Sequence, residues 1–396
     1  MLPDHILMPV KRNGLDPVPD LRRHREEEGV SRIKFPLGIG AWLVTGYEDT
    51  RAVLGGTERF SNDFRQFAGI IGTEKENPGG LGFSDPPDHT RLRRVVMPEF
   101  TGRRLARLGP RVEGIVAERL DGMAASASEG VVDLMATFAL PVPALSICEL
   151  LGVPYADRAE FQRLATARFD ILEGAEGAIS AITDALPYLE RLVKAQRAEP
   201  GDGLLGRLVT DHGHELTDVE LSGLADGLLT GGLETTTSML ALGTIVLLER
   251  PAVAAELRAD DSVIDPFVEE LLRYLSVVQV AFPRFAREDV EIGGQRIAKG
   301  DIVIASLSGA NRDPAVAGAD PDRFDLHRGG TRHVAFGYGA HRCVGAELAK
   351  IEMRLAFPAL VRRFPEMSLA LDVDDIPYRK RSIVFGLDRL PVRLGQ

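Results

Sequence analysis

A glycine-rich segment around a cysteine is the part of the sequence best suited to chemistry. Residues 336–345 read FGYGAHRCVG. The two inner glycines let the backbone turn tightly against a flat or bulky group. A helical pattern begins directly after Cys343, so the thiol is predicted at a helix N-terminus, where unpaired N–H groups and the helix dipole favour a thiolate. His341 and Arg342 add positive charge nearby. A thiolate held in this way could ligate iron.

Simpler interpretations of this segment exist. A single cysteine beside a glycine turn is most often a buried structural residue. A zinc site is excluded because no second Cys or His stands at ligand spacing. A dinucleotide-binding loop is excluded because the third glycine of its fingerprint is missing. Taken alone, these residues leave a structural cysteine and a metal-ligating thiolate open.

A long helix with an unusual middle is predicted upstream. Thr217 and Glu220 have the spacing of a capping box, and apolar residues recur until Pro251 stops the pattern. The middle, residues 229–237, reads LTGGLETTT. Each interior glycine costs up to ~1 kcal/mol relative to alanine, and threonine hydroxyls can bond back to a preceding carbonyl. The cluster indicates either a close helix contact with Glu234 facing water or a groove with a function.

These two segments together resemble the cytochrome P450 family. The pattern FGxGxHxCxG matches that family's haem-binding loop at every fixed position, and GGLET is similar to its oxygen-binding groove. The resemblance covers the chain from about 40 to 390. It implies haem b as the cofactor and Cys343 as the axial iron ligand, with Phe336 and Gly345 in the haem-binding loop.

The resemblance also implies roles for the middle of the long helix. Gly231 and Gly232 would let haem and O₂ approach the backbone. Thr235 would hydrogen-bond an iron-bound peroxo species or an ordered water, and Glu234 would relay protons from solvent. The acid in bacterial members is usually Asp, so the longer Glu234 leaves the relay geometry open. Glu234 and Thr235 are the predicted catalytic residues.

Four basic side chains are predicted to bind the haem propionates, which are carboxylates that need donors when partly buried. His89 and Arg93 lie four residues apart and share one face of a helix. Arg284 and His341 complete this set.

A buried ionic network is also implied by the resemblance. Glu270 and Arg273 match the family's Glu-x-x-Arg motif, and Arg323 matches the Arg of its Pro-x-Arg-Phe element. In the family this Arg completes the network of the Glu and the first Arg. The three residues are therefore assigned a structural role.

The composition is that of a large globular protein. The chain has 396 residues, 44% of them hydrophobic, and a net charge of -11, which disfavours nucleic-acid binding. Cys148 stands in an apolar helical context and is expected in the core, and two isolated thiols indicate a reducing cytosol. The N-terminal stretch has no apolar signal core, and the most apolar stretch, Phe138 to Val153, is interrupted by Pro141, Pro143 and Glu149 and cannot serve as a membrane span. The sequence thus predicts a cytoplasmic protein without a membrane anchor.

The predicted fold is mainly α with a minor antiparallel β portion. The resemblance implies the cytochrome P450 fold over one catalytic domain, residues 1–396, with a single haem between the long core helix and the cysteine loop. Strands are expected at Trp42 to Thr45, Val290 to Ile292, Arg296 to Ile297 and Ile302 to Ala305, and a further helix at Pro266 to Tyr274.

The implied activity is monooxygenation, in which one atom of O₂ enters a C–H or C=C bond. The substrate is expected to be a mid-sized, largely apolar small molecule such as a natural product, steroid or terpenoid. The pocket would be lined by the 60–85 loop with Phe64, Phe67 and Ile70, and by 165–180, Leu228 to Thr236, Val277 to Phe282 and Ser382 to Val384. Two alternatives are a peroxide-driven peroxygenase and a non-catalytic docking module. Both are disfavoured because the acid–Thr pair and the thiol are retained.

Electrons are expected from a ferredoxin or flavodoxin with its NAD(P)H reductase, because no reductase domain follows Gln396. Residues 91–111 hold seven arginines against the single acid Glu99 and form the predicted docking surface, with Arg93 turned towards a propionate. A solvated basic face with no partner is the alternative. A carrier protein is a further candidate partner.

Overall fold

The structure is a computed structural model that describes residues 8–34, 40–63, 80–126, 130–159, 175–330, 332–379 and 382–395, with only the backbone for 175–185. The chain forms two compact units. Unit 1 comprises Met1–Asn62, Ser238–Cys343 and Leu360–Gln396, and unit 2 comprises Asp63–Thr237 and Val344–Ala359. Helices α12 (Asp218–Leu248) and α17 (Ala346–Arg363) pass from one unit into the other. The single catalytic domain stays a prediction.

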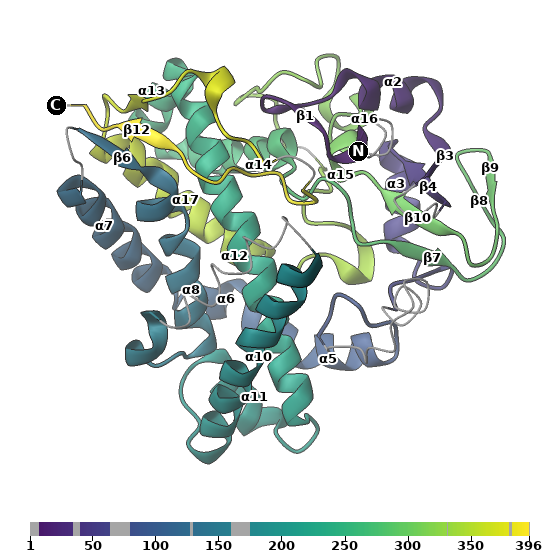
Figure 1. Cartoon of the computed structure of the whole chain (residues 1–396), viewed down its shortest axis with the longest axis horizontal. Coiled ribbons are helices and arrows are strands. Elements are labelled where there is room, and N and C mark those ends of the chain that lie inside the picture. Colours follow the sequence, from purple (N-terminus) through teal and green to yellow (C-terminus); the bar gives the residue numbers. More distant parts are fainter. Residues whose placement is uncertain are drawn as a thin grey trace. The chain divides into compact units, whose positions relative to one another are not determined.

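Unit 1 contains a five-stranded sheet (Figure 1). Its strands in spatial order are β3 (Val30–Lys34), β4 (Gly40–Val44), β10 (Ile302–Ala305), β7 (Arg284–Ala286) and β5 (Phe60–Ser61). The pair β4–β10 is parallel and the other three pairs are antiparallel. The two central strands read GAWLV and IVIA and are buried almost throughout, as expected for strands covered on both faces. The sequence predicted these strands but not the parallel pair.

Unit 1 also contains helices and short strands outside this sheet. A helix of nine residues, α3 (Tyr47–Gly55), follows β4 and packs against β10. The strands predicted at 290–292 and 296–297 are present as a hairpin, β8 and β9. The other elements are η1 (Met8–Val10), β1 (Arg12–Asn13), β2 (Asp16–Pro17), α2 (Pro19–Glu27), α13 (Pro251–Ala259), η7 (Asp261–Val263), α14 (Ile264–Leu275), β8 (Val290–Ile292), β9 (Gln295–Ile297), α15 (Leu307–Ala310), α16 (Pro314–Ala317), η8 (Gly339–His341), β11 (Ser368–Leu369), η9 (Val373–Asp375) and β12 (Pro391–Arg393).

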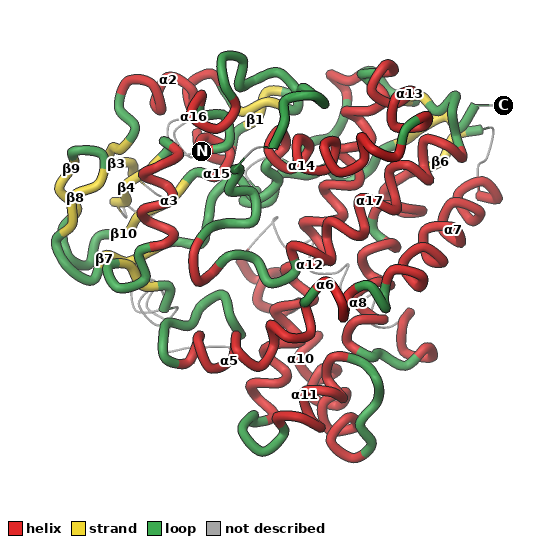
Figure 2. The backbone as a smooth tube through the Cα atoms, turned by 180° about the vertical axis from the view of Figure 1, so that it is seen from behind, coloured by secondary structure: helices red, strands yellow, loops and turns green. Residues whose placement is uncertain are grey.

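Unit 2 is almost entirely helical (Figure 2). Its core is a cluster of Leu, Val and Ile side chains from α8, α10, α11 and the first half of α12. Cys148 on α8 is buried in this cluster, and burial raises the pKa of its thiol to about 12, which confirms the expected core position. The elements are α5 (Asp88–Val96), η3 (Met97–Phe100), α6 (Gly102–Leu105), α7 (Gly109–Ser126), β6 (Val131–Asp133), η4 (Met135–Ala139), α8 (Pro141–Leu151), η5 (Tyr155–Asp157), α10 (Ala175–Ala198) and α11 (Leu204–His212).

The predicted capping box starts α12. The Glu220 amide donates to the Thr217 hydroxyl at 3.2 Å, and the Glu220 carboxylate accepts from the Thr217 amide at 2.8 Å. The helix ends at Leu248, and Pro251 begins α13. Among the described residues, α12 is the one helix long and apolar enough to cross a membrane, and 72% of its most apolar window is buried inside the structure. Burial of this kind is typical of a core helix. Location in the cytoplasm stays a prediction.

Candidate functional site

The cysteine loop folds back on itself within unit 1. The Gly337 amide donates to the Val334 carbonyl at 2.8 Å, and the Cys343 amide donates to the Phe336 carbonyl at 2.8 Å. Gly337 and Gly339 take φ angles of +71° and +75°, which favour glycine. These bonds bring the two ends of the loop together and leave the Cys343 side chain exposed, whereas free cysteines are usually buried.

Helix α3 packs directly against this loop. A Cβ at Gly339 would lie 2.7 Å from the Cα of Gly55, so the two backbones touch. Arg51 donates to the Tyr338 hydroxyl at 2.9 Å, and its guanidinium lies 4.5 Å from the centre of the Tyr338 ring. The glycine at position 339 is thus required both by its φ angle and by the close approach of α3.

A buried ionic network on α14 supports the loop from another side. The guanidinium of Arg273 binds both carboxylate oxygens of Glu270 at 2.7 Å and donates to the Asn311 carbonyl at 3.1 Å. The side chain of Asn311, fully buried, accepts from the Val334 amide at 2.7 Å and donates to the Ser276 hydroxyl at 2.8 Å. Asn311 therefore connects the Glu270–Arg273 pair to the start of the cysteine loop. The motifs considered in the sequence did not include this residue.

The third arginine of the network is not the one expected. Arg323 is 65% exposed in its side chain and pairs with Asp325 at 2.7 Å, and only its backbone carbonyl accepts from Arg273. Arg328 is 10% exposed and binds Glu270 at 3.1 Å. The structural role assigned to the Arg323 side chain is wrong, because the turn after it carries Arg328 inward instead.

The two glycines of α12 face different surroundings. A Cβ at Gly232 would lie 3.0 Å from Cδ1 of Ile147, so this glycine allows α8 to pack closely. A Cβ at Gly231 would meet no atom within 4 Å among the described residues, and Gly231 is exposed. Thr235, one turn later, donates its hydroxyl hydrogen to the Gly231 carbonyl at 2.7 Å. The close helix contact that the sequence offered as one alternative occurs at Gly232. Gly231 is open among the described residues, and a groove with a function there stays a prediction.

An exposed strip runs along this buried helix. Gly227, Thr230 and Gly231 are exposed, and Glu234 and Thr235 are half-buried, while the residues that follow from Thr236 onward are buried. Their spacing of three and four residues places them on one helix face. The strip carries an acid and a hydroxyl side by side, which could hold and pass a proton.

The four predicted propionate donors are divided between the units. In unit 2, His89 and Arg93 lie four apart on α5, as predicted. His89 is 1% exposed, and burial, together with Arg93, lowers its pKa. In unit 1, Arg284 on β7 is buried and donates to the Phe282 carbonyl at 2.8 Å, and His341 ends the η8 turn of the cysteine loop.

Two segments predicted to line the pocket are joined in unit 1. Val278 and Val384 form an antiparallel bridge, and next to it Phe282 and Ile383 expose 51% and 54% of their surface. Single exposed apolar side chains are common on protein surfaces, so the lining of a substrate pocket by these residues stays a prediction. We call residues 277–282 and 382–384 the apolar wall. The other predicted lining residues Phe64, Phe67 and Ile70, and most of 165–180, lie outside the described residues.

Acidic side chains neutralise several arginines of the predicted docking surface, residues 91–111. Arg94 pairs with Glu215 at 3.0 Å, Arg111 with Glu149 at 2.7 Å, and Arg91 with Glu220. Arg104 lies 3.8 Å from Glu99. Three of these four acids lie outside residues 91–111, where a count along that segment could not find them. Within the described residues, the exposed Arg103 and Arg107 have no ion pair.

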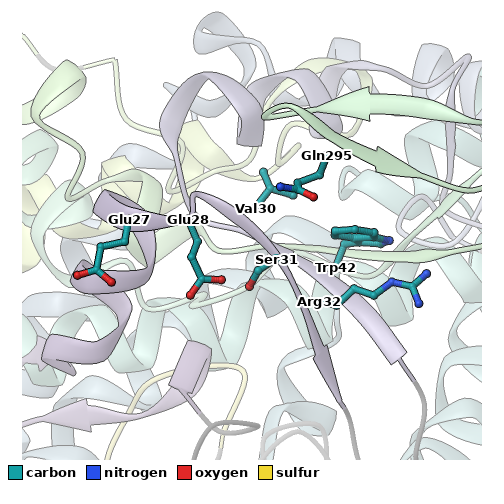
Figure 3. Close-up of a pocket in the computed structure, with 7 residues that line it drawn as sticks. All are labelled: Glu27, Glu28, Val30, Ser31, Arg32, Trp42 and Gln295. Atoms are coloured by element: carbon teal, nitrogen blue, oxygen red, sulfur yellow. The ribbon is translucent and has the colours of Figure 1, made fainter.

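A shallow groove of about 480 Å³ lies on unit 1, between the end of α2, strands β3 and β4, and the hairpin β8–β9 (Figure 3). Arg32 stacks over the Trp42 ring at 5.1 Å and binds Asp301 at 3.0 Å, and the Trp42 indole donates to Asp301 at 2.8 Å. None of the lining residues Glu27, Glu28, Val30, Ser31, Arg32, Trp42 and Gln295 is a predicted site residue. This groove is not the candidate site.

Comparisons with known proteins agree with the motifs. The sequence model of the family Cytochrome P450 matches residues 188–391. Cytochrome P450-SU2 of Streptomyces griseolus is 39% identical over 402 residues, which cover 98% of this chain and 97% of that protein. The 6-deoxyerythronolide B hydroxylase of Saccharopolyspora erythraea is 41% identical over 93% of this chain and 94% of its own length.

A solved structure has the same fold. In the complex of the X-domain and OxyB from teicoplanin biosynthesis, the matching chain is 38% identical, with a TM-score of 0.86 and coverage of 98% of this chain and 99% of that one. The chain therefore belongs to the cytochrome P450 family, whose members bind haem b. It is a monooxygenase-type oxidoreductase with the cytochrome P450 fold, as the sequence predicted.

Proposed function

We propose that this enzyme inserts one oxygen atom of O₂ into a mid-sized, largely apolar natural product, by hydroxylation or epoxidation, with electrons from a separate redox partner. The observation that carries the proposal is the exposed strip on α12, where Glu234 and Thr235 stand beside the open side of Gly231. Activation of O₂ consumes protons that must come from solvent, and the acid and hydroxyl of this strip would deliver them, whereas H₂O₂ already contains the protons that leave as water.

Haem b fits the chemistry of the residues present. Cys343 would hold the iron through its exposed thiol, which a helix start favours as thiolate. His89, Arg93, Arg284 and His341 would donate to the two propionates. When bound, the haem supplies the activation of O₂, and a thiolate ligand favours O–O cleavage. Cys343→Ala should remove the absorbance of the reduced carbon monoxide complex at the thiolate position, and an unchanged spectrum would remove Cys343 from iron ligation.

Thr235 and Glu234 would deliver the protons that O₂ activation needs. Because the Thr235 hydroxyl donates to the Gly231 carbonyl, its oxygen lone pairs are left to accept a hydrogen bond from a water or another donor on the open side. The half-buried Glu234 carboxyl can exchange protons with solvent and pass them along that face. Glu234 and Thr235 would thus transfer protons from solvent to the open side of Gly231, and each would return to its starting protonation state.

The apolar wall and the relatives support the substrate class. Phe282 and Ile383 present apolar surface that would be stabilised by covering it with an apolar ligand. One relative is named a hydroxylase of 6-deoxyerythronolide B, which supports hydroxylation of a natural product. A carrier-bound substrate is a second candidate; one solved relative, OxyB, forms a complex with an X-domain, so a protein partner has a precedent among the relatives.

The redox partner is proposed to be an acidic ferredoxin or flavodoxin. Arg103 and Arg107 would form the centre of the docking surface, because both are exposed and neither has an ion pair within the described residues. Complementary charge raises the rate of encounter more than it raises affinity.

The test measures how NADPH, O₂ and product are coupled. A screen for ligands that shift the haem Soret band first supplies a substrate. With it, Thr235→Ala should raise peroxide formed per NADPH by about tenfold or more, since general acid–base groups contribute roughly 10²–10⁴ in rate. Thr235→Ser keeps the hydroxyl and is the matched control, with coupling near wild type. Equal peroxide yields for the alanine variant and the wild type would refute the role of this strip.

A further inference from the structure

The two segments of the apolar wall are held together by backbone bonds. The Gln279 amide donates to the Ile383 carbonyl at 3.0 Å, and the Phe385 amide donates to the Val277 carbonyl at 2.7 Å. Val278 pairs with Val384 between these bonds. A two-stranded contact this short is marginally stable by itself, so its geometry depends on what else holds it.

One buried side chain supplies a cross-link at this point. Gln279 is 1% exposed, and its amide nitrogen donates to the Ser382 carbonyl at 2.7 Å and to the Val10 carbonyl at 3.1 Å. Its amide oxygen accepts from Nε of Arg12 at 2.7 Å. Both donors and one acceptor site are thus used, which fixes which way the amide points. The side chain joins both halves of the wall to the segment Met8–Asn13.

Arg12 anchors that segment in turn. Its guanidinium donates to the carbonyls of Leu15, Leu275 and Ser276 at 3.2, 3.0 and 3.2 Å. It also lies 4.5 Å from the centre of the Phe385 ring, directly after the wall. Burial of the guanidinium, with Arg312 nearby, lowers the pKa of Arg12, while Asp16 opposes this change. Arginine stays charged at neutral pH, so the anchor is a permanent cation.

We propose that Arg12 and Gln279 are positioning residues that set the spacing of the apolar wall and thereby decide which substrates fit. Neither side chain needs to touch the substrate, because each acts through the backbone of 277–279 and 382–385. The proposal rests on the proposed function, in which the wall contacts the substrate. It assigns to the N-terminal segment a control of specificity that neither the motifs nor the relatives indicate.

Two azole probes of different size can test this in the haem-loaded enzyme. Imidazole binds haem iron without reaching far from it, whereas phenylimidazole carries a second ring that needs space beyond the iron. The ratio of their dissociation constants is measured from the Soret shift. It reports how much space the apolar wall leaves beyond the iron, and it does not depend on turnover. The variants are Gln279→Met, Gln279→Glu and Arg12→Met, with Phe282→Ala as a direct change in the wall. Gln279→Glu keeps an acceptor for Arg12 but loses both amide donors.

A buried glutamine in unit 2 provides the matched control. Gln196 is 8% exposed and its amide oxygen accepts from the Gly201 amide at 2.9 Å. Gln196→Met should lower thermal stability as Gln279→Met does, without changing the azole ratio. A change in the azole ratio that Gln279→Met shows and Gln196→Met does not is therefore caused by the wall and not by a general loss of stability.

We expect each Gln279 and Arg12 variant to change the azole ratio by about fivefold or more. A change of this size is typical when a few side chains at a binding surface become less ordered. Imidazole affinity and the carbon monoxide spectrum should stay unchanged. If Phe282→Ala changes the ratio but Gln279→Met and Gln279→Glu do not, the positioning role is refuted and the proposed substrate wall stands. If Phe282→Ala also leaves the ratio unchanged, the wall itself, and with it the proposed substrate contact, is refuted.

Discussion

Replacing Asn311 by alanine removes the side chain that joins the buried Glu270–Arg273 pair to the cysteine loop. Its amide oxygen is the acceptor for the Val334 amide, and the loop's first turn begins at the Val334 carbonyl, which accepts from Gly337. The backbone carbonyl of residue 311, which binds Arg273, is unaffected by the change. The variant therefore tests the link to the loop and leaves the ionic pair in place.

The expected cost follows from the groups left without partners. Val334 is 1% exposed, so its amide would lose its acceptor in a buried place, which costs about 1–3 kcal/mol. The Ser276 hydroxyl loses a donor but keeps its own bond to the Arg273 carbonyl at 2.9 Å, so its loss is about 0.5–1.5 kcal/mol. The sum of about 1.5–4.5 kcal/mol corresponds to a fall in Tm of about 2–5 °C, because a chain of 396 residues unfolds with an entropy of about 2.1 cal/mol/K per residue.

The assay combines thermal unfolding with the spectrum of the reduced carbon monoxide complex. Asn311→Ala should lower Tm and move part of the absorbance from the thiolate position to shorter wavelength, because the loop is freed near Cys343. Ser276→Ala is the matched control, since it removes the other partner of Asn311 and leaves the Val334 bond intact. A full thiolate spectrum in Asn311→Ala, together with a normal Tm, would show that the loop does not depend on this link.

Two further predictions concern groups away from the loop. Glu352 on α17 is 2% exposed, and burial raises the pKa of its carboxyl from 4.5 to about 8. As pH rises, the unfolded chain loses this proton at a lower pH than the folded protein does. The free energy of unfolding should therefore fall between about pH 4.5 and about pH 8. Glu352→Gln should remove that fall and raise Tm by several degrees at pH 8, and equal pH profiles of Tm for the two proteins would contradict it. Reversing the charge at Arg103 and Arg107 together should slow reduction by an acidic ferredoxin about tenfold at low salt, with the difference fading at high salt. Lys34→Glu, an exposed cation on β3, is the control, and equal reduction rates in all three proteins would exclude this docking surface.

The elements that sequence predicted well depend on local signals. The capping box at Thr217, the stop at Pro251 and the glycine turn before Cys343 are each written in a few neighbouring residues, and the structure has them at those places. The difference between Gly231 and Gly232 could not be predicted, because it depends on Ile147 of another helix.

Long-range partners explain the remaining differences. Arg323 has the motif position, yet Arg328 reaches Glu270, because the path of the turn decides which side chain points inward. The arginines at 91–111 looked unpaired because the acids that bind three of them come from α8, α12 and the turn before α12. Asn311, Gln279 and Arg12 match no motif, and most of their hydrogen-bond partners are distant in sequence.

The parallel pairing of β4 with β10 also bears on how the chain folds as it is made. Ala41 pairs with Ile302 and Val44 with Ala305, so β4, which pairs with β3 on one side, waits for about 260 further residues before its partner on the other side exists. At roughly 5–20 residues per second this wait lasts about 13–50 seconds on the ribosome. Helices α5 to α11 are synthesised within that interval, and helices form faster than strand pairs distant in sequence. During that interval one edge of β4, with the apolar sequence AWLV, is unpaired and can act as a template for pairing with another chain.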